Sequence, residues 1–97
     1  MPVWTNCTIE SYYGTEEAAD DNRGIVEIDG GRISVTYDYD DEPVVYEGGE
    51  IGTGHFELTK QGGGGRASLH RFPDGLLLDG WWHEGRETGM WRISLAN

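Results

Sequence analysis

The side chains that could act as nucleophiles, bases or metal ligands are few and widely spaced in this chain. Cys7 is the one cysteine, and the histidines are His55, His70 and His83. A catalytic cysteine needs a neighbouring base and an orienting group, and no local pattern supplies them. Zinc sites that are recognisable from sequence have close spacings such as His-x3-His, which do not occur here. We therefore expect Cys7 to behave as a small buried apolar residue. We also expect the protein to bind no metal and no cofactor and to have no enzymatic activity.

The acidic segment "DYDDEP", which runs from Asp38 to Pro43, superficially resembles a calcium-binding loop. An EF-hand loop has glycine at its sixth position and glutamate at its twelfth, where this chain has Pro43 and Gly49. An EF-hand is therefore not expected, although a loose, weak divalent site is an alternative. The carboxylates of Asp38, Asp40 and Asp41 are instead candidates for binding a basic partner.

The glycine-rich run "GGGGRAS", residues 62–68, is not a phosphate-binding loop. It lacks the Gly-Lys-Ser/Thr ending whose backbone and side chains hold phosphates. The acidic balance of the whole chain also opposes phosphate binding. A flexible hairpin connection is the expected role of this run.

The net charge of −11 lies entirely in the first half of the chain. Residues 1–50 contain 13 acids and 2 bases, whereas residues 51–97 contain 5 of each. Such a field repels nucleic-acid phosphates and anionic membranes, and it attracts a basic protein. Solubility alone is the competing explanation, because acidic surfaces keep small proteins apart.

The start of the chain, "MPVWTNCTIESYY", lacks the basic region and long apolar run of a signal peptide. A single cysteine cannot form the internal disulfides that often stabilise small secreted domains. No segment approaches the roughly 20 apolar residues of a membrane-spanning helix. We therefore expect a cytoplasmic protein that does not bind membranes.

Strands rather than helices are expected to position these residues. The chain has 97 residues, 16 glycines and 3 prolines, with β-branched and aromatic residues between the glycines. Alternating runs separated by turn residues predict strands over 3–13, 24–41 (a hairpin), 44–50, 54–60, 66–72, 76–84 and 90–96, with a solvated loop over 14–24. This spacing predicts one all-β domain over residues 1–97, an antiparallel up-and-down meander of about eight short strands closing into a small barrel.

The adjacent tryptophans Trp81 and Trp82 cannot both face the core, because side chains alternate along a strand. Burying the face of Trp81 would also bury Asp79 without an evident cationic partner. Trp82 should therefore face inward. We expect it to lie opposite Trp91 as a structural aromatic pair, with residues 84–89 as the loop.

This register places Trp81 opposite Arg92 on the outer face, within reach of a cation–π contact. His83 lies on the same face of its strand as Trp81 and Asp79. Trp81, His83 and Arg92 are therefore candidates for a binding surface on the outside of the barrel.

The meander has an early tryptophan, Trp4, and a closing strand that contains Trp91 and Arg92, together with pieces such as Gly-Trp-Trp and Tyr-Glu-Gly. This arrangement resembles the calycins, the group of lipocalin, avidin and fatty-acid-binding barrels. The resemblance implies that Trp4 packs across one barrel end against Arg92. It also implies a small apolar or aromatic ligand inside the barrel.

The expected core consists of the inward-facing apolar residues of these strands. They are Ile9, Val26, Ile28, Ile33, Val35, Tyr37, Val44, Tyr46, Phe56, Leu58, Leu69, Leu78, Trp82, Trp91, Ile93 and Leu95.

Two functions follow from these observations. The first is a non-catalytic acidic interaction protein that binds a basic protein partner, as an inhibitor or immunity-type protein does. The alternative is a calycin-type barrel that binds a small apolar or aromatic ligand. The one-sided charge and the short chain, which encloses little space, favour the first. A homodimer could also form through Trp81 or through an edge strand.

Overall fold

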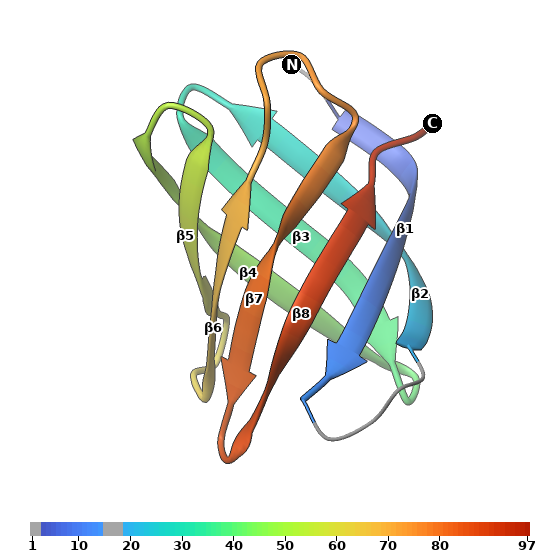
Figure 1. The fold of residues 1–97 in the computed structure, drawn as a ribbon. Helices are drawn as coiled ribbons and strands as arrows, with labels where there is room; N and C mark the ends of the chain where they lie inside the picture. The colour runs from blue at the N-terminus through green and yellow to red at the C-terminus, as the bar shows by residue number, and fades with distance from the viewer. Residues whose placement is uncertain (1–2, 15–18) are drawn as a thin grey trace.

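Eight antiparallel strands follow one another around a closed barrel in the computed structural model, which describes residues 3–14 and 19–97 (Figure 1). The strands are β1 (Val3–Tyr13), β2 (Ala19–Asp29), β3 (Arg32–Tyr39), β4 (Glu42–Gly52), β5 (His55–Lys60), β6 (Gly65–His70), β7 (Leu77–Glu84) and β8 (Glu87–Ser94). The predicted all-β meander that closes into a small barrel is confirmed. Within the described ranges there is no helix that could cross a membrane.

Closure of the barrel comes from the pairing of β8 with β1. Residues Thr8 to Tyr13 of β1 lie opposite Ser94 to Gly89 of β8. No strand in the described part of the chain is therefore left at an open sheet edge. A second copy therefore finds no free edge strand among the described residues, because each edge already has a partner within the chain. A homodimer through Trp81 stays a prediction.

Tight turns hold consecutive strands side by side. Gly30 and Gly31 join β2 to β3 with φ values of 58° and 81°, and Asp40 and Asp41 join β3 to β4 with φ values of 52° and 63°. Two successive residues with positive φ match the twist of a two-residue hairpin turn. Aspartate tolerates this conformation better than most residues other than glycine. The two aspartates are therefore part of the turn as well as part of the acidic surface.

The segment 14–24, predicted as a loop, is a strand from residue 19 onward; residues 15–18 lie outside the described part. β2 begins at Ala19 and pairs with β1 up to Tyr12. The segment lacks an apolar alternation because the half-buried Asn22 lines a pocket at the end of the barrel instead of the core. Farther along, a side chain at Gly24 would lie 2.6 Å from Ile9 Cδ1. The pattern of polar and small residues thus reflects a strand that begins at the open end of the barrel.

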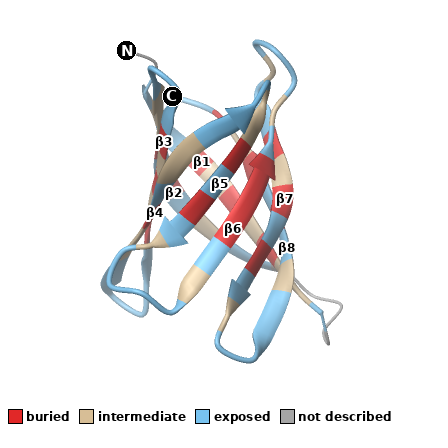
Figure 2. Ribbon diagram, turned by 90° about the vertical axis from the view of Figure 1, so that its left-hand side faces the viewer, coloured by how far each residue is buried: buried red, intermediate tan, exposed pale blue. Residues whose placement is uncertain are grey.

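The core fills the middle of the barrel much as the sequence predicts. Of the predicted residues, Ile28 and Val44 are only partly buried and pack against the core, and the others are buried. Cys7 and Ala67 join them, so Cys7 does behave as a small buried apolar residue. Figure 2 shows the buried positions on the barrel wall, including three consecutive ones on β6.

A β-bulge changes the expected alternation at the start of β1. The pairing of β1 with β2 shifts register between Trp4 and Cys7. Strict alternation would put Val3 on the same face as Cys7 and Trp4 on the other. With the bulge, Trp4 packs against the core while Val3 is exposed. The extra residue of the bulge is what allows both Trp4 and Cys7 to pack against the core.

The predicted register of the closing hairpin is wrong by two residues. Trp82 lies opposite Gly89 and Trp91 lies opposite Gly80, with a tight turn at Gly85. A Cβ at Gly89 would lie 2.8 Å from Cζ2 of Trp82, so the bulky ring needs a glycine beside it. Both tryptophans are buried as predicted. They do not form a cross-strand pair with each other.

Candidate functional site

The two ends of the barrel differ. One end holds the start of β1, the end of β8 and the connections β2–β3, β4–β5 and β6–β7, and the other holds the connections β3–β4, β5–β6 and β7–β8 (Figure 1). A pocket of about 510 Å³ opens at the second end. We call it the mouth pocket. Its aromatic lining consists of Tyr13, Tyr37, Tyr39, Trp82 and Trp91, and its charged lining consists of Lys60, Glu84, Arg86 and Glu87.

Edge-to-face contacts fix the aromatic rings of the mouth pocket. Tyr13 meets Trp82 with ring centroids 5.2 Å apart and an interplanar angle of 79°. Trp91 meets Tyr46 at 4.9 Å and Tyr37 at 6.1 Å, also edge to face. Such pairs are favourable because the positive edge of one ring faces the negative face of the other. The rings of Tyr13, Tyr37, Trp82 and Trp91 therefore have orientations that are set before any ligand arrives.

Hydrogen bonds orient the two indoles further. Nε1 of Trp91 donates to Oγ of Ser11 at 2.9 Å in a buried contact, and Nε1 of Trp82 donates to the carbonyl of Met90 at 3.2 Å. The hydroxyl of Thr88 donates to the carbonyl of Trp82 at 3.0 Å. Met90 and Ser11 thus satisfy the N–H groups of two indoles that are almost fully buried, and Thr88 satisfies the backbone carbonyl of Trp82.

Glu84 at the end of β7 is the charged residue with the most contacts in the mouth pocket. Its carboxylate accepts a hydrogen bond from the hydroxyl of Tyr46, and Nζ of Lys60 lies 3.5 Å from Oε1. A side chain at Gly65 would lie 2.5 Å from the hydroxyl of Tyr46, so this glycine leaves room for the pair. The half-buried carboxylate therefore has a fixed place inside the pocket.

Two tyrosines of the mouth pocket, Tyr13 and Tyr37, and the neighbouring Tyr46 have raised pKa values. Burial raises the pKa of Tyr13 to about 12, and nearby acidic groups add to the shift. Burial, reinforced by the Glu84 carboxylate, raises the pKa of Tyr37 and Tyr46 above the usual range of tyrosine. The pocket therefore presents neutral phenols that can donate a hydrogen bond and offer an aromatic face.

The predicted outer-face residues share one side of β7 and β8 but do not pair as expected. Trp81 lies opposite Met90, and Arg92 lies opposite Asp79. The cationic neighbour of Trp81 is Arg66 of β6, whose guanidinium carbon is 5.8 Å from the ring centroid. The predicted contact of Trp81 with Arg92 is therefore wrong, because the register of the hairpin differs by two residues.

The remaining outer-face candidates are exposed. His83 lies opposite Thr88 on the outside of β7, and the Trp81 side chain is 37% exposed. Asp38, Asp40 and Asp41 are exposed at the end of β3 and in the β3–β4 turn. The strands β4, β5 and β6 separate β3 from β7 in the sheet. The acidic candidates and the Trp81 group therefore occupy different parts of the barrel.

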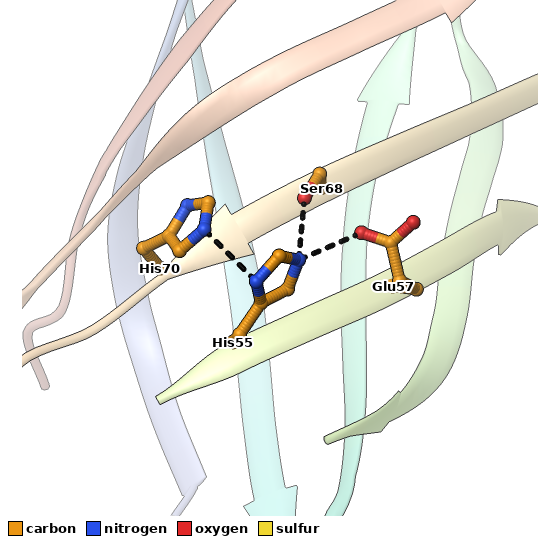
Figure 3. Close-up of polar contacts among 4 residues, drawn as sticks. All are labelled: His55, Glu57, Ser68 and His70. Atoms are coloured by element: carbon orange, nitrogen blue, oxygen red, sulfur yellow. Dashed lines mark hydrogen bonds and ion pairs between the residues drawn. The ribbon is translucent and has the colours of Figure 1, made fainter. Parts of the chain in front are cut away.

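A second polar group, the outer cluster, lies on β5 and β6 and consists of His55, Glu57, Ser68 and His70 (Figure 3). Nε2 of His55 is 3.1 Å from both Oγ of Ser68 and a carboxylate oxygen of Glu57. Nδ1 of His55 is 3.1 Å from Nε2 of His70. The hydrogen bond from Ser68, with a further contribution from His55, lowers the pKa of Glu57.

The outer cluster contains the residue types of a hydrolytic triad but not the geometry of one. In a triad, the base contacts the serine through one nitrogen and the orienting carboxylate through the other. Here Ser68 and Glu57 share the same nitrogen of His55. Ser68 is also only 2% exposed, between Glu57 and Trp81 in register, so a substrate cannot reach its hydroxyl. The cluster ties β5 to β6.

Sequence reasoning missed most of the mouth pocket. Tyr37, Trp82 and Trp91 were predicted only as core residues, and Tyr13, Tyr39 and Glu84 were not singled out. The available signal was that β1 and β3 both carry tyrosines in their last residues, Tyr13 and Tyr39. These strands run toward the same end of the barrel, so their final side chains surround one opening.

At the barrel end opposite the mouth pocket, the contact between Trp4 and Arg92 that the calycin resemblance implies is not present. Trp4 does lie against an arginine, with a distance of 5.1 Å from the guanidinium carbon to the ring centroid. That arginine is Arg71, which follows β6, and not Arg92 of the last strand. Arg92 is exposed on the outside of β8, since its neighbours Trp91 and Ile93 face the core.

Comparison of the chain with models of known protein families, with curated proteins and with solved structures found no match. In the residues that the structure describes, no three histidine, cysteine or acidic side chains converge in a way that could hold a metal ion. The mouth pocket and the distribution of charge are therefore the features of the described residues that bear on function.

Proposed function

We propose that this chain is a calycin-type binding barrel that takes a small, flat aromatic molecule into the mouth pocket. The observation that carries the proposal is a pocket of about 510 Å³ bounded by five aromatic side chains. Small-molecule sites commonly occupy a few hundred to a thousand Å³, and barrel mouths are a frequent location. The closed up-and-down order of the strands supports the same relation to calycins.

The chemistry of the lining favours a flat ligand. Aromatic side chains attract planar molecules through stacked or edge-to-face contacts. Tyr37 and Tyr39 offer rings from β3, and Trp82 and Trp91 offer them from the closing hairpin. Because the indoles are already held by hydrogen bonds, little conformational entropy is lost when a ligand binds between them.

Quinoline, a flat bicyclic molecule that is uncharged at neutral pH, should bind in the mouth pocket. Titration should shift the indole N–H signals of Trp82 and Trp91 in NMR spectra more than that of Trp81, which lies outside. Tyr39→Ala should weaken the affinity for quinoline by about 3- to 10-fold, which corresponds to the binding free energy of one aromatic contact. Tyr39 is 49% exposed, so its loss should leave the fold intact.

Tyr12→Ala is the matched control for this experiment. Tyr12 lies next to Tyr13 on β1 but does not line the mouth pocket, and its hydroxyl donates to Glu10 at 2.7 Å. Its replacement should leave the affinity for quinoline unchanged. Equal weakening in the two variants, or a shift of the Trp81 signal alone, would count against binding in the mouth pocket.

A second candidate function is the binding of a basic protein by the acidic surface of β2 to β4. The ion pairs found among the described residues join His55 to Glu57 and Lys60 to Glu84, all from β5 and β7. The exposed acids at the β3–β4 turn, including Asp40 and Asp41, have no such partner in the described part of the chain. Their charge is free to attract a cationic surface.

The salt dependence of binding to a basic protein such as lysozyme tests this second candidate. Affinity should fall at least about tenfold between low and high salt, because screening weakens interactions between exposed charges. Asp40→Asn/Asp41→Asn should weaken binding at low salt more than Asp74→Asn/Asp79→Asn, which removes the same charge elsewhere. Asparagine tolerates the positive φ of these turn positions. A salt-independent affinity would contradict the candidate.

A further inference from the structure

The mouth pocket combines aromatic rings with carboxylates at two depths. Glu84 lies inside it beside Tyr46, and Glu87 lies at its rim. A second hollow adjoins the rim and shares Tyr13, Tyr39, Arg86 and Glu87 with the pocket. Asp20 lines this hollow, so a third carboxylate faces the same opening.

The mouth pocket itself is lined by two basic residues, Lys60 and Arg86, and by two acidic ones, Glu84 and Glu87. Lys60 is 3.5 Å from Glu84, so these two charges largely offset each other. Arg86 is exposed in the β7–β8 turn. On the other side of the opening, the exposed β3–β4 turn adds the carboxylates of Asp40 and Asp41 next to Tyr39. Acidic groups therefore outnumber basic ones around the opening.

We propose that the ligand of the mouth pocket is an organic cation, of the class of N-alkylated aromatic or quaternary ammonium compounds. This inference rests on the proposed function and specifies the charge of the ligand. The faces of Tyr and Trp rings are negative and attract a cation within about 6 Å of the ring centroid. A quaternary cation needs no hydrogen-bond acceptor, so rings together with nearby carboxylates are sufficient to hold it.

The state of the tyrosines is consistent with a negative potential in the pocket. Besides burial, the groups that raise the pKa of Tyr13 include Asp20 and Glu87, and Glu84 contributes to the shift of Tyr37. The same carboxylates that disfavour a phenolate would stabilise a positive charge on a ligand.

Three quinolines of similar shape and different charge test the inference: N-methylquinolinium, quinoline and quinoline-4-carboxylate. Affinities would be measured from the indole N–H shifts of Trp82 and Trp91. N-methylquinolinium should bind about tenfold more tightly than quinoline, and the carboxylate should bind more weakly than both. Higher salt should reduce the difference between the cation and the neutral compound, because part of the opening is exposed.

Carboxylate variants locate the origin of the preference. Glu84→Gln and Glu87→Gln should each reduce the preference for the cation by about 3-fold or more, with little effect on quinoline. Glu47→Gln removes the same charge from the exposed outer face of β4 and should change nothing. Glu84→Gln can fail to fold because Tyr46 and Lys60 lose their partner. In that case the cation preference of Glu87→Gln decides the test, because Glu87 is exposed.

The outcomes separate this inference from the proposed function. If quinoline or its carboxylate binds as tightly as the cation, the ligand is not selected for positive charge and the inference is overturned, while the mouth pocket remains a ligand site. If none of the three compounds shifts the signals of Trp82 and Trp91, the proposed function fails and the inference fails with it.

Discussion

Replacing Trp91 by alanine is expected to lower the free energy of unfolding by about 3–5 kcal/mol, the usual cost of removing a large aromatic residue from a core. Trp91 is 2% exposed and meets both Tyr37 and Tyr46 edge to face. Its loss would leave a cavity beneath the mouth pocket and two tyrosine rings without their partner. Urea unfolding followed by circular dichroism measures the change, as a lower midpoint with a similar slope.

Trp81→Ala is the matched control, since Trp81 belongs to the same hairpin but lies outside the barrel. Its replacement should cost roughly 1 kcal/mol or less, because it loses mainly the exposed contact with Arg66. Similar losses for the two variants would mean that Trp91 is not the main packing element of this end of the core.

The hydrogen bond between Trp91 and Ser11 gives a second test of the same packing. Ser11→Ala alone should cost about 1–3 kcal/mol, because it leaves a buried indole N–H without an acceptor. In the double variant Ser11→Ala/Trp91→Phe neither polar group remains, so the loss should be smaller than the sum of the two single losses. Additive losses would show that the hydrogen bond contributes little to stability.

The sequence predicts the barrel well because the patterns that identify each strand and each turn lie within a few neighbouring residues. Alternating runs such as Ile33, Val35 and Tyr37 identify a half-buried strand, and Gly30-Gly31 identifies the turn before it. Up-and-down connections then leave little freedom in strand order. Closure itself is consistent with this reasoning, since a meander of eight strands has two edges that are best removed by pairing with each other.

The register of the closing hairpin could not be predicted from apolar alternation. A shift of two residues preserves which side chains face inward, so pairing Trp82 with Trp91 and pairing it with Gly89 give the same inward pattern. What decides between them is volume. Two indoles opposite each other would overcrowd the interior of a small barrel, whereas each indole fits beside a glycine of the neighbouring strand.

The mouth pocket could not be predicted because it depends on contacts that are distant in sequence. Tyr13, Tyr39 and Glu84 come from three strands, and they meet only because β1, β3 and β7 end at the same side of the closed barrel. The outer cluster is similar, since His55 and Ser68 are neighbours only through the pairing of β5 with β6. The parity argument did place Trp81 outside, but its cationic neighbour, Arg66, lies on another strand.

Gly80→Ala is also expected to destabilise the barrel, through a different mechanism from that of Trp91→Ala. Gly80 lies in the middle of β7, opposite both Leu69 and Trp91. A Cβ at this position would overlap the carbonyl oxygen of Ser68 and would lie 3.0 Å from Cα of Leu69. Both neighbours are backbone atoms, which cannot move aside as the end of a flexible side chain can. Overpacking of this kind usually costs about 1–3 kcal/mol and sometimes more, and here it would also separate β6 from β7.

Gly52→Ala distinguishes this steric effect from the general consequences of replacing glycine in a strand. Gly52 is exposed at the end of β4, and its nearest neighbour for an added Cβ is 3.9 Å away on His55. Alanine at this position should leave stability unchanged or raise it by about 0.4–1 kcal/mol, because it restricts the unfolded chain. The two variants add the same methyl group, so only the closeness of the backbone differs. If Gly80→Ala unfolds at the same urea concentration as Gly52→Ala, then β6 and β7 can separate locally without loss, and the glycine is not what permits their close approach around Trp91.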